Sequence, residues 1–163
     1  MSVKVTTKDI DKGLRKIKSE VDKFKEFIVK CGILSSSNEV VDGVAVVEYA
    51  MYNELGVMSK SGGWRIPPRS FIRGWVDADF NKIRALVTRL YSQVIDQKLD
   101  AMTALNRLGV YAKSGIQVYI RKGTFAPLSP KTVKAKGSSQ PLIDTGTMRK
   151  TVNYEIVNVR AKE

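Results

Sequence analysis

The stretch Tyr49–Phe71, which reads YAMYNELGVMSKSGGWRIPPRSF, decides the fold of this chain. An apolar run from Val44 to Leu55 ends at Gly56, a residue type favoured just after a helix C-terminus. Asp42 precedes the run as a candidate N-cap. We therefore expect a buried helix that begins at Asp42 and stops at Gly56.

A polar loop and a rigid extended segment follow this helix. The loop residues, which offer nothing large and apolar to bury, are Ser59, Lys60, Ser61, Gly62 and Gly63. We expect them to form an exposed, flexible loop tip. Pro67 and Pro68 favour extended backbone in the residues before them, and neither can donate to a strand ladder. Residues 66–69 should therefore be extended, and a long helix should begin at Ser70.

Apolar side chains that recur every three or four residues predict two long helices joined as a hairpin. The first helix is expected from Ser70 to Val94, and the second from Met102 to a stop at Gly123. The segment 96–98 breaks the periodicity between them. Small residues on the second helix should permit close approach of the first; they are Ala101, Ala104, Gly109, Ala112 and Gly115.

Residues 1–27 are predicted to form an amphipathic N-terminal helix. Its narrow apolar stripe consists of Ile10, Leu14, Ile17, Val21, Phe24 and Ile28, and lysines cover the other faces. The stripe could pack on its own domain or on a neighbouring subunit. Acidic residues among the lysines argue against a helix that binds a membrane surface. The helix should yield to a strand near Glu26, because residues 27–34 are apolar and rich in β-branched side chains.

Two further strands complete the predicted fold. A turn at residues 35–38 should lead into a short strand at 39–41, and a closing strand over Val152–Val159 should have one buried and one solvated face. The chain is thus expected to be one α+β domain over residues 1–163. A small, mostly antiparallel sheet would pack against the helical hairpin, with the amphipathic N-terminal helix as an addition.

Residues 124–140 are predicted to be a long basic loop with one helical turn that begins at Ser129-Pro130. Five basic residues occur within 121–136 without an acid, namely Arg121, Lys122, Lys131, Lys134 and Lys136. They could neutralise phosphates, meet an acidic protein surface or simply keep a loop solvated. Downstream, Asp144 is expected to cap a short segment over 145–150.

The order of these motifs resembles the head-to-tail joining or tail-completion proteins of long-tailed bacteriophages. The element YAMYNELG, a flexible loop and IPPRSFIR are followed by LSPKT and PLIDTG, and the match covers most of residues 28–158. Ser70 departs from the family, which usually has a third proline there. The resemblance implies a structural role for Asn53, Glu54, Gly56, Pro67, Pro68, Arg69, Phe71, Leu142, Asp144 and Gly146.

The resemblance also implies a function. The protein would be a structural virion component, made in the host cytoplasm, that forms a homo-oligomeric, sixfold ring at the head–tail junction. It would complete the tail or join it to the head connector. Its partners would be other copies of itself, portal-side connector proteins and tail tube or tail terminator proteins, with a possible contact to DNA in the channel. The loops at 57–63 and 124–140 would dock.

Composition restricts the chemistry of the chain. It has 163 residues, of which 43% are hydrophobic and 27% charged, and its net charge of +12 is concentrated in the terminal regions. The absence of histidine and the single Cys31 exclude imidazole-dependent nucleophiles and histidine or thiolate zinc sites. Neither a phosphate-binding loop nor a dinucleotide-binding fingerprint is present. We expect no enzyme activity, no cofactor or metal, and no membrane span.

Two alternatives to a virion role remain. One is a basic nucleic-acid-binding module, and the other is a hydrolase that uses carboxylates. Glu48 and Glu54 are the candidate pair for a hydrolase, but a separation of six residues places them on different sides of a helix. Glu54 is instead expected to pair with Arg69 or to bind backbone amides in the loop that follows it.

Overall fold

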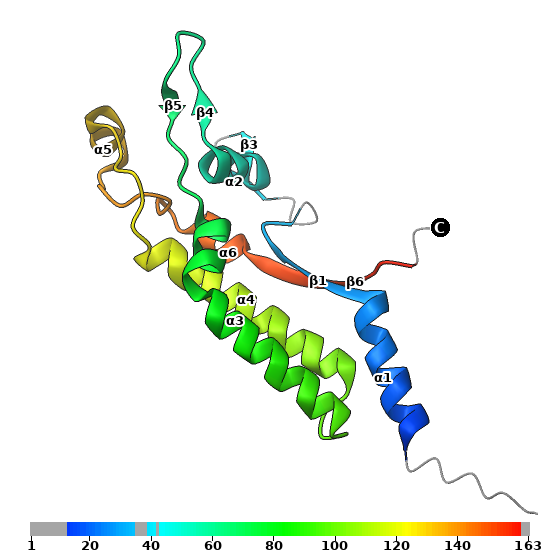
Figure 1. The fold of residues 1–163 in the computed structure, drawn as a ribbon. Helices are drawn as coiled ribbons and strands as arrows, with labels where there is room; N and C mark the ends of the chain where they lie inside the picture. Colours follow the sequence, from blue (N-terminus) through cyan, green and yellow to red (C-terminus); the bar gives the residue numbers. More distant parts are fainter. Residues whose placement is uncertain (1–12, 35–38, 42, 161–163) are drawn as a thin grey trace, which may run out of the picture.

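Two long antiparallel helices form the body of the protein, with smaller elements near their ends and a two-stranded ribbon along the second of them (Figure 1). The computed structural model describes residues 13–34, 39–41 and 43–160. The long helices are α3 (Phe71–Ile95) and α4 (Ala101–Lys122), so the predicted helical hairpin is confirmed. The other helices are α1 (Leu14–Glu26), α2 (Val46–Leu55), α5 (Pro130–Lys136) and α6 (Thr147–Thr151).

The strands form three separate antiparallel pairs. These are β1 (Phe27–Gly32) with β6 (Asn153–Asn158), β2 (Val40–Val41) with β3 (Val44–Ala45), and β4 (Val57–Met58) with β5 (Trp64–Ile66). Small antiparallel pairs packed with long helices confirm the predicted α+β class. The β1–β6 ribbon, with Phe27 opposite Asn158 and Gly32 opposite Asn153, lies against α4.

The core has two parts along the helical hairpin. The larger part joins α2, α3, α4 and α6 through buried residues that include Val46, Phe71, Ile116 and Met148. The smaller part lies near the connection of the long helices, where Leu90, Val94 and Ala104 are buried and Phe24 of α1 packs against them. The apolar side of α1 therefore packs on its own chain, although Leu14 stays 67% exposed. Ile10 lies outside the described residues.

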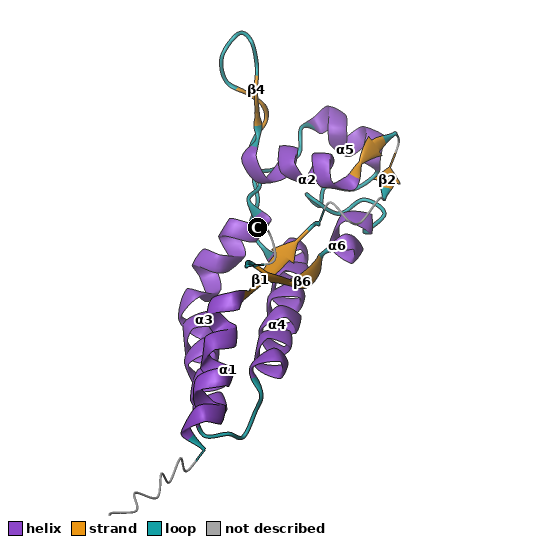
Figure 2. Ribbon diagram, turned by 90° about the vertical axis from the view of Figure 1, so that its right-hand side faces the viewer, coloured by secondary structure: helices purple, strands orange, loops and turns teal. Residues whose placement is uncertain are grey.

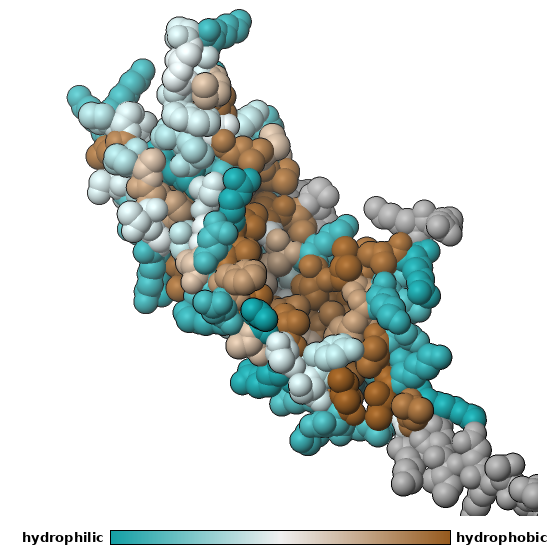
Figure 3. Space-filling model, viewed as in Figure 1, coloured by the Kyte–Doolittle hydropathy of each residue, from teal (hydrophilic) through white to brown (hydrophobic). Residues whose placement is uncertain are grey.

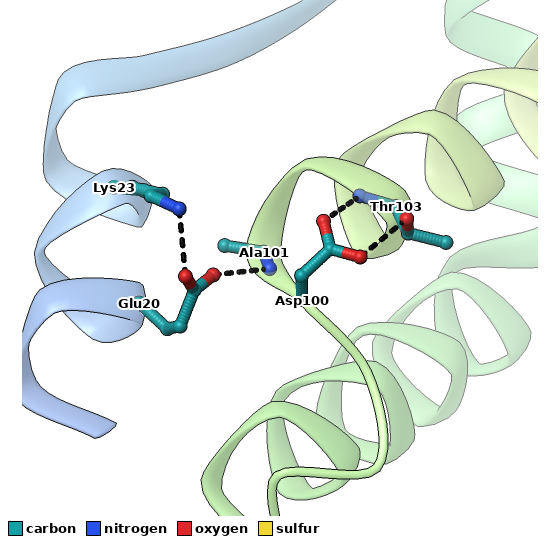
Figure 4. A network of polar contacts seen from close by, with 5 residues as sticks. All are labelled: Glu20, Lys23, Asp100, Ala101 and Thr103. Atoms are coloured by element: carbon teal, nitrogen blue, oxygen red, sulfur yellow. Dashed lines mark hydrogen bonds and ion pairs between the residues drawn. The ribbon is translucent and has the colours of Figure 1, made fainter. Parts of the chain in front are cut away.

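A carboxylate fixes α1 to the beginning of α4 (Figure 4). Glu20 accepts a hydrogen bond of 2.8 Å from the Ala101 amide and one of 2.7 Å from Lys23. Asp100, the N-cap of α4, accepts from the amide and hydroxyl of Thr103. Because the first amides of a helix lack partners within the helix, carboxylates there are stabilising.

Several expected boundaries differ in the structure. Helix α2 begins at Val46 after an N-cap at Ala45 without a side-chain cap, so the predicted start at Asp42 is wrong; Asp42 itself lies outside the described residues. Only one face of α2 is buried, because just that face meets α3 and α6. The predicted turn at 35–38 also lies outside the described residues.

The closing strand lacks the predicted alternation of buried and solvated faces. All its residues after Asn153 are half-buried. The transition from helix to strand after Glu26 is confirmed, since α1 ends there and β1 begins at Phe27.

The small residues of α4 serve two neighbours. A Cβ on Gly115 would lie 2.3 Å from Nε1 of Trp75, so this glycine admits α3 as predicted. A Cβ on Gly109 would instead lie 2.2 Å from the ring of Tyr154 in β6. The expectation that all these small residues face the first long helix is therefore wrong for Gly109, where α4 supports the β1–β6 ribbon.

We predict that Gly115→Ala lowers the free energy of unfolding by about 1–3 kcal/mol, because the added methyl would overlap the Trp75 ring. Alanine exceeds glycine in helix propensity by about 1 kcal/mol, so propensity alone predicts the opposite sign. Urea denaturation measures the difference. The control is Ser114→Ala, at the exposed neighbouring position. Equal stability of Gly115→Ala and the natural chain would contradict the packing.

A second prediction concerns the stability of the fold at acidic pH. The Ala101 amide, and after it Lys23, lower the pKa of Glu20 in the folded chain. The ionised carboxylate therefore stabilises the fold above the ordinary glutamate pKa, and this contribution is lost as the pH falls through the lowered value. The stability gap between the natural chain and Glu20→Gln should be largest near neutral pH and shrink in acid, as measured by denaturation at several pH values.

The control for acid sensitivity is Glu155→Gln, which removes the same charge from β6. The difference in stability between the natural chain and Glu155→Gln should not shrink in the same way as the pH is lowered. A gap between the natural chain and Glu20→Gln that stays constant from neutral pH into acid would contradict the assignment.

Candidate docking surface

Glu54 connects the end of α2 to the beginning of α3. Its carboxylate accepts hydrogen bonds from the amides of Phe71, Ile72 and Arg73 at 2.7, 2.9 and 3.0 Å. The Ser70 hydroxyl donates to the Glu54 carbonyl at 2.7 Å. Glu54 binds backbone amides, as predicted. These amides belong to α3, however, and not to the loop that follows α2. The alternative prediction, an ion pair between Glu54 and Arg69, is wrong.

Arg69 holds the segment that follows α4. It is only 6% exposed, and its guanidinium donates to the carbonyls of Ala126 and Pro127 at 2.7 and 2.9 Å. Its backbone amide donates to the carbonyl of Asn53 at 2.6 Å. Burial lowers the pKa of Arg69. The carbonyl oxygens therefore replace the water that the buried guanidinium has lost. Through its side chain and its backbone, Arg69 connects the end of α2, the segment before α3 and the segment after α4.

Gly56 allows the chain to turn sharply out of α2. Its φ of 77° lies in the left-handed region, and a Cβ would meet the ring of Trp64 at 2.7 Å. The same Cβ would lie 3.0 Å from both the Ile66 carbonyl oxygen and Cδ of Pro68. Only glycine fits this close approach without displacement. Strand β5 ends at Ile66, directly before Pro67, as the missing proline donors require.

The β4–β5 hairpin projects beyond the rest of the molecule (Figures 1 and 2). Its tip, residues 59–63, contains the predicted loop, and two backbone hydrogen bonds order it. The Ser59 amide donates to the Gly63 carbonyl at 2.9 Å, and the Gly62 amide donates to the Ser59 carbonyl at 3.2 Å. The strands on either side were not predicted. Val57 and the Trp64–Ile66 run beside Gly62-Gly63 were the signal that could have revealed them.

Exposed apolar side chains continue from α2 into this hairpin. On α2 they are spaced four residues apart, so they share one side of the helix. We define the hairpin surface as these residues with two from the hairpin, namely Val47, Met51, Leu55, Met58 and Trp64. Their exposed fractions run from 36% to 60%. Figure 3 shows hydrophobic residues gathered over α2.

An apolar pocket of about 310 Å³ lies between α2, the β2–β3 pair and α6. Its apolar walls include Val41, Val44, Tyr49, Tyr52, Leu142 and Met148, and Asp144 contributes an exposed carboxylate. Burial raises the pKa of Tyr49. Of the predicted motif residues, Leu142, Asp144 and Gly146 line this pocket, while Asn53, Glu54 and Arg69 meet at the beginning of α3.

The predicted cap at Asp144 is wrong. Helix α6 begins after Gly146, whose φ is 79°, and no side chain caps it. The Thr145 hydroxyl instead accepts from the Thr147 amide at 3.3 Å. Asp144 lies two residues before the N-cap position, Gly146, and is exposed beside the pocket.

The five basic residues lie on α4 and α5, two helices that Gln140 connects through hydrogen bonds. Arg121 and Lys122 belong to the last turn of α4 and not to a loop, which corrects the prediction. Ser129 accepts from the Thr132 amide as the predicted N-cap of α5, which carries Lys131, Lys134 and Lys136. Gln140 joins the helices, because it accepts from Lys136 at 2.6 Å and donates to the Arg121 carbonyl at 3.0 Å. We call these five residues the basic corner.

The two glutamates of α2 do not share a site. Glu48 accepts a hydrogen bond from the Tyr52 hydroxyl, whereas Glu54 faces the α3 amides. Across the described residues, no group of three or more His, Cys, Asp or Glu side chains could hold a metal ion. Within that same part of the chain, no helix is long and apolar enough to cross a membrane.

Comparison with protein-family models, with curated proteins and with solved structures gave no match to this chain.

We predict that Glu54→Ala lowers the free energy of unfolding by about 1–3 kcal/mol, because three α3 amides lose their acceptor. The control is Glu48→Ala on the same helix, which removes an exposed carboxylate and should change stability by less than about 0.5 kcal/mol. Thermal and urea unfolding compare the variants. Equal effects of the two changes would show that the contact with α3 does not stabilise the fold.

Proposed function

We propose that this protein is a structural virion component of a tailed bacteriophage. It forms a homo-oligomeric ring at the head–tail junction, where it completes the tail or joins it to the head connector. The observation that carries the proposal is the hairpin surface, an uncovered apolar area partly displayed on a projecting hairpin. Such surfaces mark places where proteins associate. The resemblance to tail-completion proteins supplies the virion context.

In this proposal the motif residues have a structural role, which is to support the projecting hairpin. Glu54 and Arg69 direct their charged groups to backbone partners within the chain. Gly56 and the two prolines set the direction in which the hairpin leaves α2. These residues hold the projecting hairpin in place, and docking is left to the hairpin and to the 124–140 segment. We assign no catalytic step, cofactor or metal to the chain.

The proposed partners are other copies of the chain, arranged as a sixfold ring, together with portal-side connector proteins and tail tube or tail terminator proteins. A pull-down with tagged protein from cells that make phage particles tests this assignment. Mass spectrometry should identify connector and tail proteins that stay bound at both low and high salt. Recovery of nucleic acid alone, lost as the salt concentration rises, would contradict the proposal.

Deleting Ser61–Gly63 should impair the joining of heads to tails without changing the melting temperature. The deleted residues are exposed, and the deletion leaves the Met58–Trp64 pair in place. Differential scanning calorimetry and counts of free heads and tails by electron microscopy provide the two measurements. The control is Lys98→Ala, in the exposed connection between α3 and α4. An unfolded deletion variant would assign the tip to the core and contradict its docking role.

The basic corner favours a second candidate function, the binding of nucleic acid. Arg121 and Lys122 end α4, and α5 carries three further lysines and no acid. Gln140 links the two helices through hydrogen bonds. This arrangement would bind phosphates through charge, either in a nucleic-acid-binding module or toward DNA in the channel. A linear fall of the logarithm of DNA affinity with the logarithm of salt concentration would support this function. The slope should be smaller for the double variant Lys131→Ala, Lys134→Ala. Salt-independent or undetectable binding would exclude it.

A further inference from the structure

The hairpin surface and the apolar pocket lie on different sides of α2. Val47, Met51 and Leu55 repeat every four residues and continue toward the hairpin, whereas Tyr49 and Tyr52 face the pocket beside α6. One chain therefore presents an apolar projection and an apolar recess that point in different directions. Figures 1 and 2 show the hairpin extending away from the body in both views.

The charges of the two features are complementary. Residues 57–66 contain the exposed bases Lys60 and Arg65 and no acid. The residues that line the pocket include the exposed Asp144 and no base. A hairpin entering this pocket would bring opposite charges together around an apolar contact, and such complementarity selects the orientation of partners.

We propose that the end of the β4–β5 hairpin of one copy docks into the pocket of a second copy of this chain, with Met58, directly before the tip, as its apolar contact. The inference rests on the proposed function, because it names the contact that would build the ring. Met58 is 60% exposed at the end of β4, and the pocket walls are aliphatic and aromatic. Burying this side chain against them removes apolar surface from water on both copies.

This contact is heterologous, since two different surfaces meet. A heterologous contact repeated around a closing rotation generates a ring, whereas one that does not close generates a filament. A pocket of about 310 Å³ admits only the end of a hairpin. The contact should therefore bury much less surface than the roughly 1,200 Å² of a stable protein interface. A single contact should therefore be weak, and the closed ring should hold through several contacts acting together.

Disulfide cross-linking between two differently tagged chains tests the contact. One chain carries Met58→Cys and the other carries Thr145→Cys, at an exposed position that lines the pocket. Cys31 can remain, because burial raises the pKa of its thiol to about 11 and so lowers its thiolate fraction at neutral pH, and because it is present in both the test and the control mixtures. We expect at least tenfold more cross-linked heterodimer than from a control mixture in which Val118→Cys, on α4, replaces Thr145→Cys.

Charge reversal provides a second readout from folded protein. Lys60→Glu and Asp144→Lys, each at an exposed position, should separately reduce the cross-linking yield about threefold or more. Combining the two changes on opposite chains should restore the yield, because opposite charges then meet again with their signs exchanged. A yield for the hairpin–pocket pair no higher than that of the control, or reversals without effect, would overturn the proposal.

The failure of this contact is distinguishable from a failure of the proposed function. If the cross-link forms in purified protein but the chain recovers no phage proteins, the contact between copies stands and the virion role falls. If phage proteins are recovered and the hairpin–pocket cross-link is absent, the contact is overturned, and the hairpin docks on another virion protein.

Discussion

The contact between Glu54 and the first amides of α3 is the constraint on which the rest of the structure depends. It fixes the end of α2 against the start of the longest helix, with Arg69 bonded to carbonyls of the segment after α4. The chain between these points leaves and returns within a small gap, and it does so as the narrow β4–β5 hairpin. The direction of that hairpin is therefore set by hydrogen bonds at its base.

The same physical device occurs at the opposite end of the body. Glu20 of α1 bonds the Ala101 amide, so each long helix receives a carboxylate from another helix at its N-terminus. These contacts differ from exposed ion pairs such as Lys82–Asp79, which contribute little because water and salt screen them. A carboxylate on free helix amides satisfies donors that have no other partner within the helix. Helix ends, more than surface charge pairs, thus organise the packing.

The functional proposals follow from what this packing leaves uncovered. The core is formed mainly where the long helices meet α2, α6 and the β1–β6 ribbon. One side of α2 and the hairpin stay outside it, although their residues are apolar. In a ring, a neighbouring copy would cover this area and remove its contact with water. The basic corner lies on separate elements, so association through apolar contacts and attraction of phosphates could be altered independently.

The sequence by itself determined the local elements. Periodic apolar residues and breakers located both long helices, and Ser129-Pro130 marked the start of α5, because caps and helix faces depend on neighbours within a few positions. The tertiary structure alone decided which partners Glu54 and Arg69 bind, why Asp144 caps nothing, and why half of α2 is exposed. Arg69 meets carbonyls 57 and 58 residues away, and β1 pairs with the last strand. Such contacts depend on how distant segments come together, which no local pattern specifies.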